Sequence, residues 1–296
     1  MKRLPGLLLL ATVVACGARG SAIAIENSQD HSQGVASGAT GGASGISAIR
    51  KTMAAEQLAL GDPLLNSLGM VLVPIPAGEF QMGSPAEEKG REYDETLHPV
   101  RITQPFYLGV REVTRRQYER VMGPHPGADD VTGETKPVTK VSWNSAVQFC
   151  RKLSEQEGQE YRLPTEAEWE FACRAATTTA YSFGHDATRL GQYAWHAGNS
   201  SLTAHVVAEK PANGWGLYDM HGNVWEWCQD WLGSYPSGGL VVDPAGPAEG
   251  AFRVLRGGSF FSPARDHRSA NRNSDRPPSR YSSTGFRLAR TYQLSP

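Results

Sequence analysis

Three stretches of the chain combine a polar cap with apolar residues spaced three to four positions apart, which is typical of amphipathic helices. Caps of this kind stand at Thr114, Ser142 and Thr165, and Gly158 offers a stop for the second stretch. The apolar positions behind these caps are Tyr118, Val121 and Met122, then Trp143, Ala146, Val147, Cys150 and Leu153, and finally Trp169, Ala172, Cys173 and Ala176. The pattern therefore predicts three short helices, each with one apolar face.

Short apolar pieces with the composition of strands lie between and after these helices. They cover residues 70–73, 106–108, 253–255 and 285–288. Long segments with neither periodicity separate them, notably 177–216 and 232–252. Few helices, few strands and much irregular chain predict an α+β domain that is low in regular secondary structure.

The front of the chain has the layout of a secretory signal peptide, which we assign to residues 1–24. A basic start precedes an apolar run over residues 7–14, and small residues follow. Val13-Val14-Ala15-Cys16 resembles a bacterial lipobox, in which Cys16 becomes lipidated and holds the protein on a membrane surface. Cleavage after Ala24 is the other interpretation, and it leaves a free periplasmic or secreted protein. We expect export in both cases and favour the lipoprotein.

A tether and a single domain are predicted to follow. Residues 25–67 include a Gly/Ser/Ala-rich run at 31–45, which favours a flexible linker. Residues 53–58 have good helix propensity, but we expect little tertiary role for them. The folded domain is then predicted over 68–293.

The charge balance and the hydrophobic content exclude several classes of protein. The 296 residues include 29 Lys+Arg and 30 Asp+Glu, so the formal net charge is −1, and a nucleic-acid partner is not expected. Hydrophobic residues make up 40% of the chain, which excludes wholesale disorder. The sequence contains no stretch of about 18 consecutive apolar residues that could span a membrane. We expect a monomeric globular domain.

Four segments resemble the formylglycine-generating, sulfatase-modifying-factor family. They read PAGEFQMGS at 76–84, YRLPTEAEWE at 161–170, NGWGLYDMHGNVWEW at 213–227, and RGGS at 256–259 together with GFR at 285–287. They occur in the family's order. The resemblance implies a variant of the C-type-lectin fold with little regular secondary structure, in agreement with the α+β interpretation.

The resemblance also implies where oxidase chemistry would reside. The oxidase members convert a cysteine of a substrate peptide to formylglycine with molecular oxygen, and two cysteines near the C-terminus hold Cu(I). Counted from the RGGS motif, those positions fall on Ser262 and His267. A hydroxyl and an imidazole do not reproduce a dithiolate site, so we do not expect copper. Our alternative hypothesis is an oxidoreductase that acts on a peptide or peptide-derived metabolite without copper, in a pocket lined by Ser259, Ser262, His267 and Trp225.

Our preferred hypothesis is binding without chemistry. In the segment 256–288, the motif residues RGGS and GFR flank a stretch in which apolar, polar and charged residues are mixed. This segment resembles the ligand-binding segment of variable proteins made by diversity-generating retroelements. We therefore expect residues 260–283 to bind a protein, peptide or glycan. The candidate contact residues are Phe261, Ser262, Pro263, Asp266, His267, Asn271 and Tyr281. Phe260 is expected either to share in this patch or to replace a core tryptophan.

The family resemblance implies a structural calcium ion. The N-x-x-G-N-x-W-E stretch of the family maps onto Asp219, Gly222, Val224 and Glu226, which offer carboxylate and carbonyl oxygens that suit Ca²⁺. The alternative is that the two carboxylates cap turns. A second family site would begin at Asn199, but the loop that supplies its other ligands is shortened here.

The chain has four cysteines: Cys16, Cys150, Cys173 and Cys228. In the family, the equivalents of Cys150 and Cys173 pair with cysteines of the C-terminal segment, and this chain has none there. We expect buried free thiols. A Cys150–Cys173 bridge or a bridge from Cys228 remains open from sequence.

Overall fold

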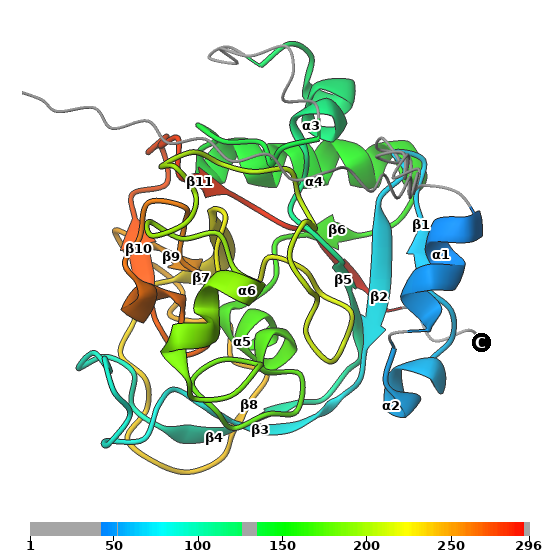
Figure 1. The fold of residues 1–296 in the computed structure, drawn as a ribbon. Coiled ribbons are helices and arrows are strands. Elements are labelled where there is room, and N and C mark those ends of the chain that lie inside the picture. The colour runs from blue at the N-terminus through cyan, green and yellow to red at the C-terminus, as the bar shows by residue number, and fades with distance from the viewer. Residues whose placement is uncertain (1–42, 52, 126–134, 293–296) are drawn as a thin grey trace, which may run out of the picture. The chain divides into compact units, whose positions relative to one another are not determined.

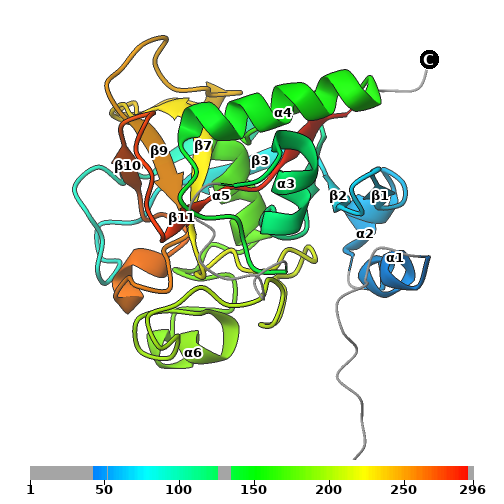
Figure 2. The same cartoon turned by 90° about the horizontal axis from the view of Figure 1, so that it is seen from above.

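The computed structural model describes residues 43–51, 53–125 and 135–292, which all belong to one compact unit that spans 38–296. Three small sheets and a few helices form it (Figures 1 and 2). Helices and strands alternate with long ordered loops, as in residues 194–224. The predicted mixed class with little regular structure is confirmed. Among the described residues, no helix is long and apolar enough to cross a membrane.

The largest sheet joins the two ends of the described chain. Its order is β1-β2-β5-β12-β6 and every neighbouring pair is antiparallel. The strands are β1 (Leu64–Leu65), β2 (Val71–Ile75), β5 (Phe106–Gly109), β12 (Ala289–Thr291) and β6 (Tyr161–Arg162). Every residue of β2 is buried, because the strand is central and covered on both faces. Figure 1 shows β2 beside β5.

The other two sheets carry three of the four segments that resemble the family, and the fourth, at 161–170, lies on β6 and α5 (Glu166–Arg174). One has the order β10-β9-β7-β11, in which β11 runs parallel to β7, and the other has the order β3-β4-β8. Their strands are β3 (Gly78–Met82), β4 (His98–Ile102), β7 (Trp225–Trp231), β8 (Val241–Val242), β9 (Arg253–Arg256), β10 (Asn273–Asp275) and β11 (Thr284–Gly285). The register of β7 against β9 is interrupted between Trp227 and Trp231.

The three predicted helices form where their caps indicate. Thr114, Ser142 and Thr165 each accept a hydrogen bond from a backbone N–H of the first turn, and Gly158 ends the second helix in the left-handed region. These helices are α3 (Arg115–Met122), α4 (Trp143–Glu157) and α5 (Glu166–Arg174). Shorter elements are α1 (Ala43–Arg50), α2 (Ala55–Leu58), η1 (Ala187–Arg189), α6 (Leu190–Tyr193) and η2 (Ala264–His267). In Figure 2, α3 and α4 lie on one side of the unit and α6 on the opposite side.

Helix α5 departs from the predicted single apolar face, because all nine of its residues are buried. Its glutamates lie inside the protein and pair with arginines instead of facing water. The helix is therefore a central element of the domain and not an amphipathic surface helix.

The prediction of a flexible linker up to residue 67 is wrong for its second half. Met53 packs in the core, Gln57 is fully buried, and β1 pairs with β2. The Gln57 amide donates to the carbonyl oxygens of Pro74 at 3.0 Å and Trp215 at 3.2 Å. A buried amide satisfied by two main-chain carbonyls fixes the segment, so the ordered unit begins before Leu68. The predicted signal peptide, Cys16 and residues 31–42 lie outside the described residues.

Candidate functional site

The segment after β9 contains Ser262 and His267, the positions onto which the resemblance mapped the copper-binding cysteines of the family. A glycine is required at position 258, where φ is +80° and a Cβ atom would lie 2.8 Å from Cδ2 of His267. The imidazole of His267 therefore packs directly on the Arg-Gly-Gly-Ser turn. Arg256 anchors the start of the turn by donating to the carbonyl oxygens of Ser269, Ala270 and Asn271.

Ser259, Ser262 and His267 converge, as the alternative hypothesis required, but their hydrogen bonds are structural. The two serine hydroxyls lie 3.1 Å apart, and all three residues are buried. Nδ1 of His267 is 3.0 Å from the carbonyl oxygen of Pro263, and Nε2 is 3.2 Å from that of Ser259. Burial lowers the pKa of His267 to about 4, so the ring is neutral at pH 7. Because both ring nitrogens face carbonyl oxygens, neither is placed to take a proton from a serine hydroxyl.

Trp225 does not belong to this group. Its side chain is buried in a core cluster that includes Tyr118, Phe149 and Phe286. The predicted pocket of Ser259, Ser262, His267 and Trp225 is therefore corrected to the first three residues, because β7 directs Trp225 into the core.

The three cysteines that the structure describes are free and buried. Burial raises the pKa of Cys173 to about 12 and raises the pKa of Cys150 and Cys228 as well. All three thiols are therefore protonated at pH 7, and thiolates suited to a soft metal are not available from them. The expectation of buried free thiols is confirmed, and the Cys150–Cys173 bridge does not form.

The residues assigned to calcium lie on and before β7, in a buried acidic region. Both carboxylate oxygens of Glu226 accept hydrogen bonds from Arg287 at 2.6 Å, and one also accepts from the Trp169 indole at 2.8 Å. Oδ2 of Asp219 accepts from the backbone N–H of Ala208 at 2.7 Å. Position 222 requires glycine, since a Cβ there would lie 2.5 Å from the carbonyl oxygen of Trp195.

A third carboxylate, Glu112, was not anticipated from the sequence. It accepts from the Asn223 amide at 3.0 Å and from the backbone N–H of Val224 at 3.2 Å. Burial, together with the neighbouring Asp219 and Glu226 carboxylates, raises the pKa of Glu112 well above its usual value. A lone glutamate in an Arg-Glu-Val segment carries no local signal for this role, because only the fold brings it beside the Gly-Asn-Val turn.

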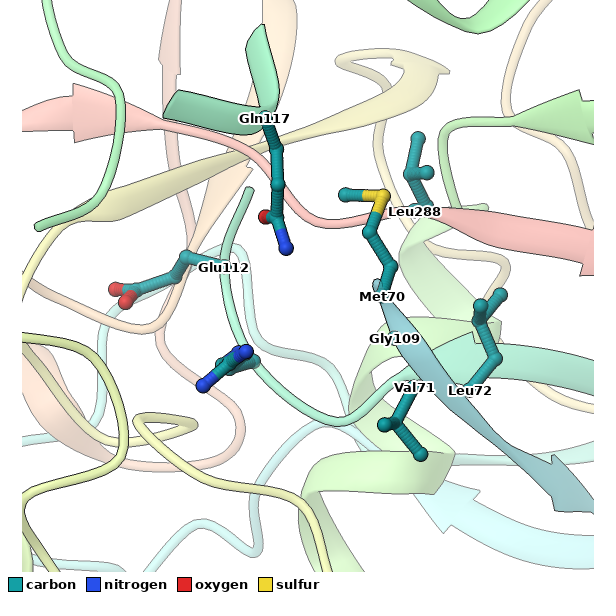
Figure 3. A pocket seen from close by; sticks show the side chains of 8 residues that line it. Met70, Val71, Leu72, Gly109, Glu112, Gln117 and Leu288 are labelled. Carbon is teal, nitrogen blue, oxygen red and sulfur yellow. The ribbon is translucent and has the colours of Figure 1, made fainter. Parts of the chain in front are cut away.

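Figure 3 shows Glu112 at the edge of a small cavity of about 10 Å³, the space of roughly one water molecule. The apolar side chains of Met70 and Leu288 close one side, and the Glu112 carboxylate points away from them. The Gln117 amide lies between the two groups. The carboxylate of Glu112 is thus directed toward Asn223 and not into the apolar wall.

Carboxylate and carbonyl oxygens, the donor types of the acidic region, are those that a hard cation takes as ligands. Burial raises the pKa of Asp219 to about 6, with a further contribution from Glu226. Burial is the larger cause of this shift, and the negative charge of Glu226 adds to it while Arg287 opposes it. Within the described ranges, no group of three or more His, Cys, Asp or Glu side chains is arranged to hold a metal ion. The ligand set implied by the resemblance has only two carboxylate side chains, so two backbone carbonyls would have to complete it.

Asn199, where a second calcium site would begin, uses its amide within its own loop. Its Oδ1 accepts from the backbone N–H of His196 at 2.8 Å, and its Nδ2 donates to the carbonyls of Gly191 and Ala194. These three hydrogen bonds give the Asn199 side chain a structural role in its loop.

A buried network of ion pairs holds the segment 256–272 against α5 and against the loop before β4. Its pairs are Arg256–Glu170, Arg256–Glu166 at 3.6 Å, Arg174–Glu170 at 2.8 Å, Arg272–Glu166 at 2.7 Å, Arg268–Glu95 at 2.6 Å and Arg268–Glu88 at 2.8 Å. Glu166, Glu168 and Glu170 alternate along α5, and their shortest ion pairs are with Arg272, Arg162 and Arg256, respectively. Apart from Arg174–Glu170 and Arg162–Glu168, the partners are far apart in sequence, so the sequence pattern could not have identified them.

Burial divides the predicted contact residues into two groups. Phe261 is 64% exposed and Tyr281 51%, Pro263 is also exposed, and Asp266 is half-buried. Ser262, His267 and Asn271 are buried. These three are corrected from contact residues to supports, because they face the turn and the ion-pair network. Phe260 is 5% exposed and belongs to the interior, so only the second phenylalanine is displayed.

Tyr93 is a further exposed aromatic residue, in a loop that packs against the 256–272 segment, and no local sequence pattern indicated it. It is 90% exposed in the loop before β4. The same loop is tied to the C-terminal segment by the Arg268–Glu95 pair, and Gly90 packs against Arg265. We call Tyr93, Phe261, Pro263, Arg265 and Asp266 the aromatic face.

Comparison with known proteins assigns the chain to a family. The profile described as "Sulfatase-modifying factor enzyme 1-like domain" matches residues 64–292. The fold is the formylglycine-generating-enzyme-like variant of the C-type-lectin fold. The chain belongs to the sulfatase-modifying factor enzyme 1-like family.

Relatives of known name support the assignment. The chain is 36% identical to the formylglycine-generating enzyme of Streptomyces coelicolor over 208 residues, which cover 64% of this chain and 62% of that enzyme. It is 29% identical to the formylglycine-generating enzyme of Bos taurus, with 74% of each chain covered. The chain thus spans about three fifths of the Streptomyces relative.

Two solved structures superpose with a TM-score of 0.68. One is Treponema denticola variable protein 1, at 30% identity over 75% of this chain and 95% of that chain. The other is PvdO from Pseudomonas aeruginosa, at 29% identity over 77% of this chain and 96% of that chain.

Proposed function

We propose that this domain binds a protein or glycan ligand through the aromatic face and performs no copper oxidase chemistry. The observation that carries the proposal is the burial and hydrogen bonding of Ser262 and His267, the two positions that the resemblance matched to copper-binding cysteines. Ser262 and His267 are buried and hydrogen-bonded within the turn, and they support an exposed Phe261 on the same segment.

The aromatic face favours a protein ligand over a glycan. Exposed Tyr93 and Phe261 accompany Arg265 and Asp266, and aromatic and arginine side chains dominate the binding energy of protein interfaces. The buried arginine network beneath them holds the backbone in place, so little conformational entropy would be lost on binding.

The test is capture of ligands by the full chain from the surface extract of its own host and from a glycan array, with matched alanine variants. Phe261→Ala and Tyr93→Ala are expected to reduce capture by about tenfold or more. Phe252→Ala is the control, because Phe252 is 41% exposed and lies outside the aromatic face. Equal capture by the wild type and the Phe261 variant would refute the proposal.

The alternative of a non-copper oxidoreductase is favoured only by similarity to formylglycine-generating enzymes. It is tested by oxygen uptake with a cysteine-containing peptide, in the presence and absence of added copper or iron. We expect no uptake above that of buffer. Uptake that His267→Ala abolishes, with folding intact, would establish the oxidoreductase instead.

We further propose that one Ca²⁺ is held by Asp219 and Glu226 with the main-chain carbonyls of Gly222 and Val224. The raised pKa of Asp219 and the acidic surroundings support this ligand set. The ion would cross-link the 219–224 turn to β7, and its role would be structural.

Export and attachment to the membrane surface are proposed from the sequence pattern. Mass spectrometry of the mature protein decides between the two leader interpretations. A diacylated N-terminus at Cys16 supports the lipoprotein, and an unmodified start at residue 25 supports a free exported protein. We also propose a monomer, for which light scattering should give the mass of one chain.

A further inference from the structure

A second hollow lies outside the segment 256–288 and outside the aromatic face. Its volume is about 310 Å³, which reaches the lower end of the range for small-molecule pockets. Helix α2, the start of β3 and the C-terminal end of α5 build it. The lining includes Glu56, Phe80, Gln81, Phe171, Thr178 and Trp215.

The floor of this pocket is aromatic. The rings of Phe171 and Trp215 meet edge to face at 5.0 Å, and Phe80 lies 5.1 Å from Phe171. Phe171 and Trp215 are buried in the core and Phe80 is half-buried. These packed rings give the pocket a fixed apolar floor, on which Phe80 has the most exposed ring.

The rim carries one carboxylate whose charge no neighbour compensates. Glu56 is exposed, and its side chain makes no hydrogen bond or ion pair with another described residue. Glu79 is already bonded to Arg101 at 2.7 Å. The guanidinium of Arg174 is occupied by Glu170 and by the carbonyl oxygens of Gly83 and Thr179.

Further unpaired acceptors accompany Glu56. Gln81 and Thr178 are exposed on the lining and, like Glu56, their side chains have no hydrogen-bond partner among the described residues. The free polar groups of the pocket are thus one carboxylate, one amide and one hydroxyl.

The position of Glu56 is set by its neighbour. Gln57 is fully buried and bonds to the carbonyl oxygens of Pro74 and Trp215, so α2 is fastened to β2 and to the pocket floor. The segment predicted as a tether therefore supplies one wall of the pocket.

We propose that this pocket binds an alkylammonium or alkylguanidinium group, with the cation at Glu56 and the aliphatic stem on Phe80, Phe171 and Trp215. A carboxylate strengthens hydrogen bonds from such a group, and an aromatic floor favours both the cation and the stem. The group is either a lysine or arginine side chain of a peptide or a free small amine. The site is independent of the proposed ligand surface.

The test uses blocked peptides and an NMR titration of the ¹⁵N-labelled full chain. The probes are acetyl-Gly-Arg-Gly-amide, acetyl-Gly-Lys-Gly-amide, n-butylammonium and the neutral analogue acetyl-Gly-citrulline-Gly-amide. We expect saturable shifts of the Trp215 and Ala77 signals with the cationic probes. Binding of the citrulline peptide should be about tenfold weaker.

Two glutamate substitutions distinguish binding in the pocket from attraction of the cationic probes to any surface carboxylate. Glu56→Gln should weaken the cationic probes by about tenfold, whereas Glu87→Gln, an exposed glutamate in the loop before β4, should not. Peptides that bind more tightly than n-butylammonium would indicate a peptide source, and the reverse order a free amine. The absence of saturable shifts, equal binding of citrulline and arginine peptides, or full affinity in the Glu56 variant would each overturn the proposal. Phe261→Ala should bind the probes normally, so failure here is distinct from failure at the aromatic face.

Discussion

The contact between His267 and Gly258 shows how one residue sets the geometry of the 256–267 turn. The ring occupies the space that a Cβ at position 258 would need, and the carbonyl oxygens of Ser259 and Pro263 face its two nitrogens. The imidazole thus acts as the core of the turn.

Gly258→Ala is expected to destabilise the protein by about 2–4 kcal/mol, because it combines positive-φ strain with a collision at 2.8 Å. Gly239→Ala is the matched control. It has φ of +79° against +80° for Gly258 but meets no atom within 4 Å, so only the strain of about 1 kcal/mol should appear. Urea denaturation of both variants measures the difference. Equal decreases in the free energy of unfolding would show that the His267 ring can move to accommodate the added methyl group.

The pH dependence of stability tests the burial of His267. Its pKa falls from 6.5 in the unfolded chain to about 4 in the folded protein, so the unfolded chain binds the proton more readily between these values. The stabilising contribution of the neutral ring is therefore complete above about pH 6.5 and is lost as the pH falls toward 4. The advantage of the wild type over His267→Gln should shrink by up to about 3 kcal/mol across this window in urea titrations. A constant difference would contradict a neutral buried ring.

Helix α5 determines the arrangement of its surroundings at the scale of the element. Glu170 is fully buried and accepts from Arg174, from Arg256 and from the backbone N–H of Gly83. One side chain thus joins α5, β9 and the end of β3. The glutamates of the TEAEWE motif are consequently structural and do not form a catalytic carboxylate pair.

Glu170→Gln should cost about 3–5 kcal/mol, because it leaves the guanidinium groups of Arg174 and Arg256 buried without their shared negative charge. Glu155→Gln on α4 removes an exposed pair with Arg151 and should change stability by less than about 1 kcal/mol. Thermal and urea unfolding compare the two variants. A loss below about 1 kcal/mol for Glu170→Gln would mean that relaxation or water replaces the ion pairs.

At the scale of the whole molecule, small sheets are joined by long loops that must be cross-linked. The three described cysteines are free, so the cross-links come from arginine–glutamate pairs and, as we propose, from one calcium ion. The C-terminal β12 pairs with β5 and β6, while β11 pairs with β7, so the last strands connect two of the sheets.

Calcium should raise the melting temperature of the chelated protein by several degrees, since a ligand that binds only the folded state stabilises it by mass action. Asp219→Asn should abolish this response. Without calcium, the same variant should be at least as stable as the wild type at pH 7, because the raised pKa of Asp219 makes its charged form unfavourable above about pH 6. Asp275→Asn, a carboxylate outside the acidic region, should keep the calcium response. Identical melting curves with calcium and with chelator would refute the site.

Local patterns in the chain accounted for the elements and for the frame of the candidate site. The caps at Thr114, Ser142 and Thr165 start helices because they satisfy the first backbone N–H groups through neighbouring atoms only. The residue types at 262 and 267 by themselves exclude a dithiolate, because neither a serine nor a histidine side chain contains sulfur. Such conclusions depend on side-chain chemistry or on contacts within four residues.

Tertiary structure alone decided which side chains are displayed and which are partners. Phe260 and Phe261 are chemically identical neighbours, yet one is buried and the other is 64% exposed, because the turn faces the core on one side. Glu112 joins the acidic region across 111 residues of sequence from Asn223, and α2 forms a pocket wall through Gln57 and Trp215. Long-range pairing of this kind depends on the packing of the complete chain, and no local periodicity encodes it.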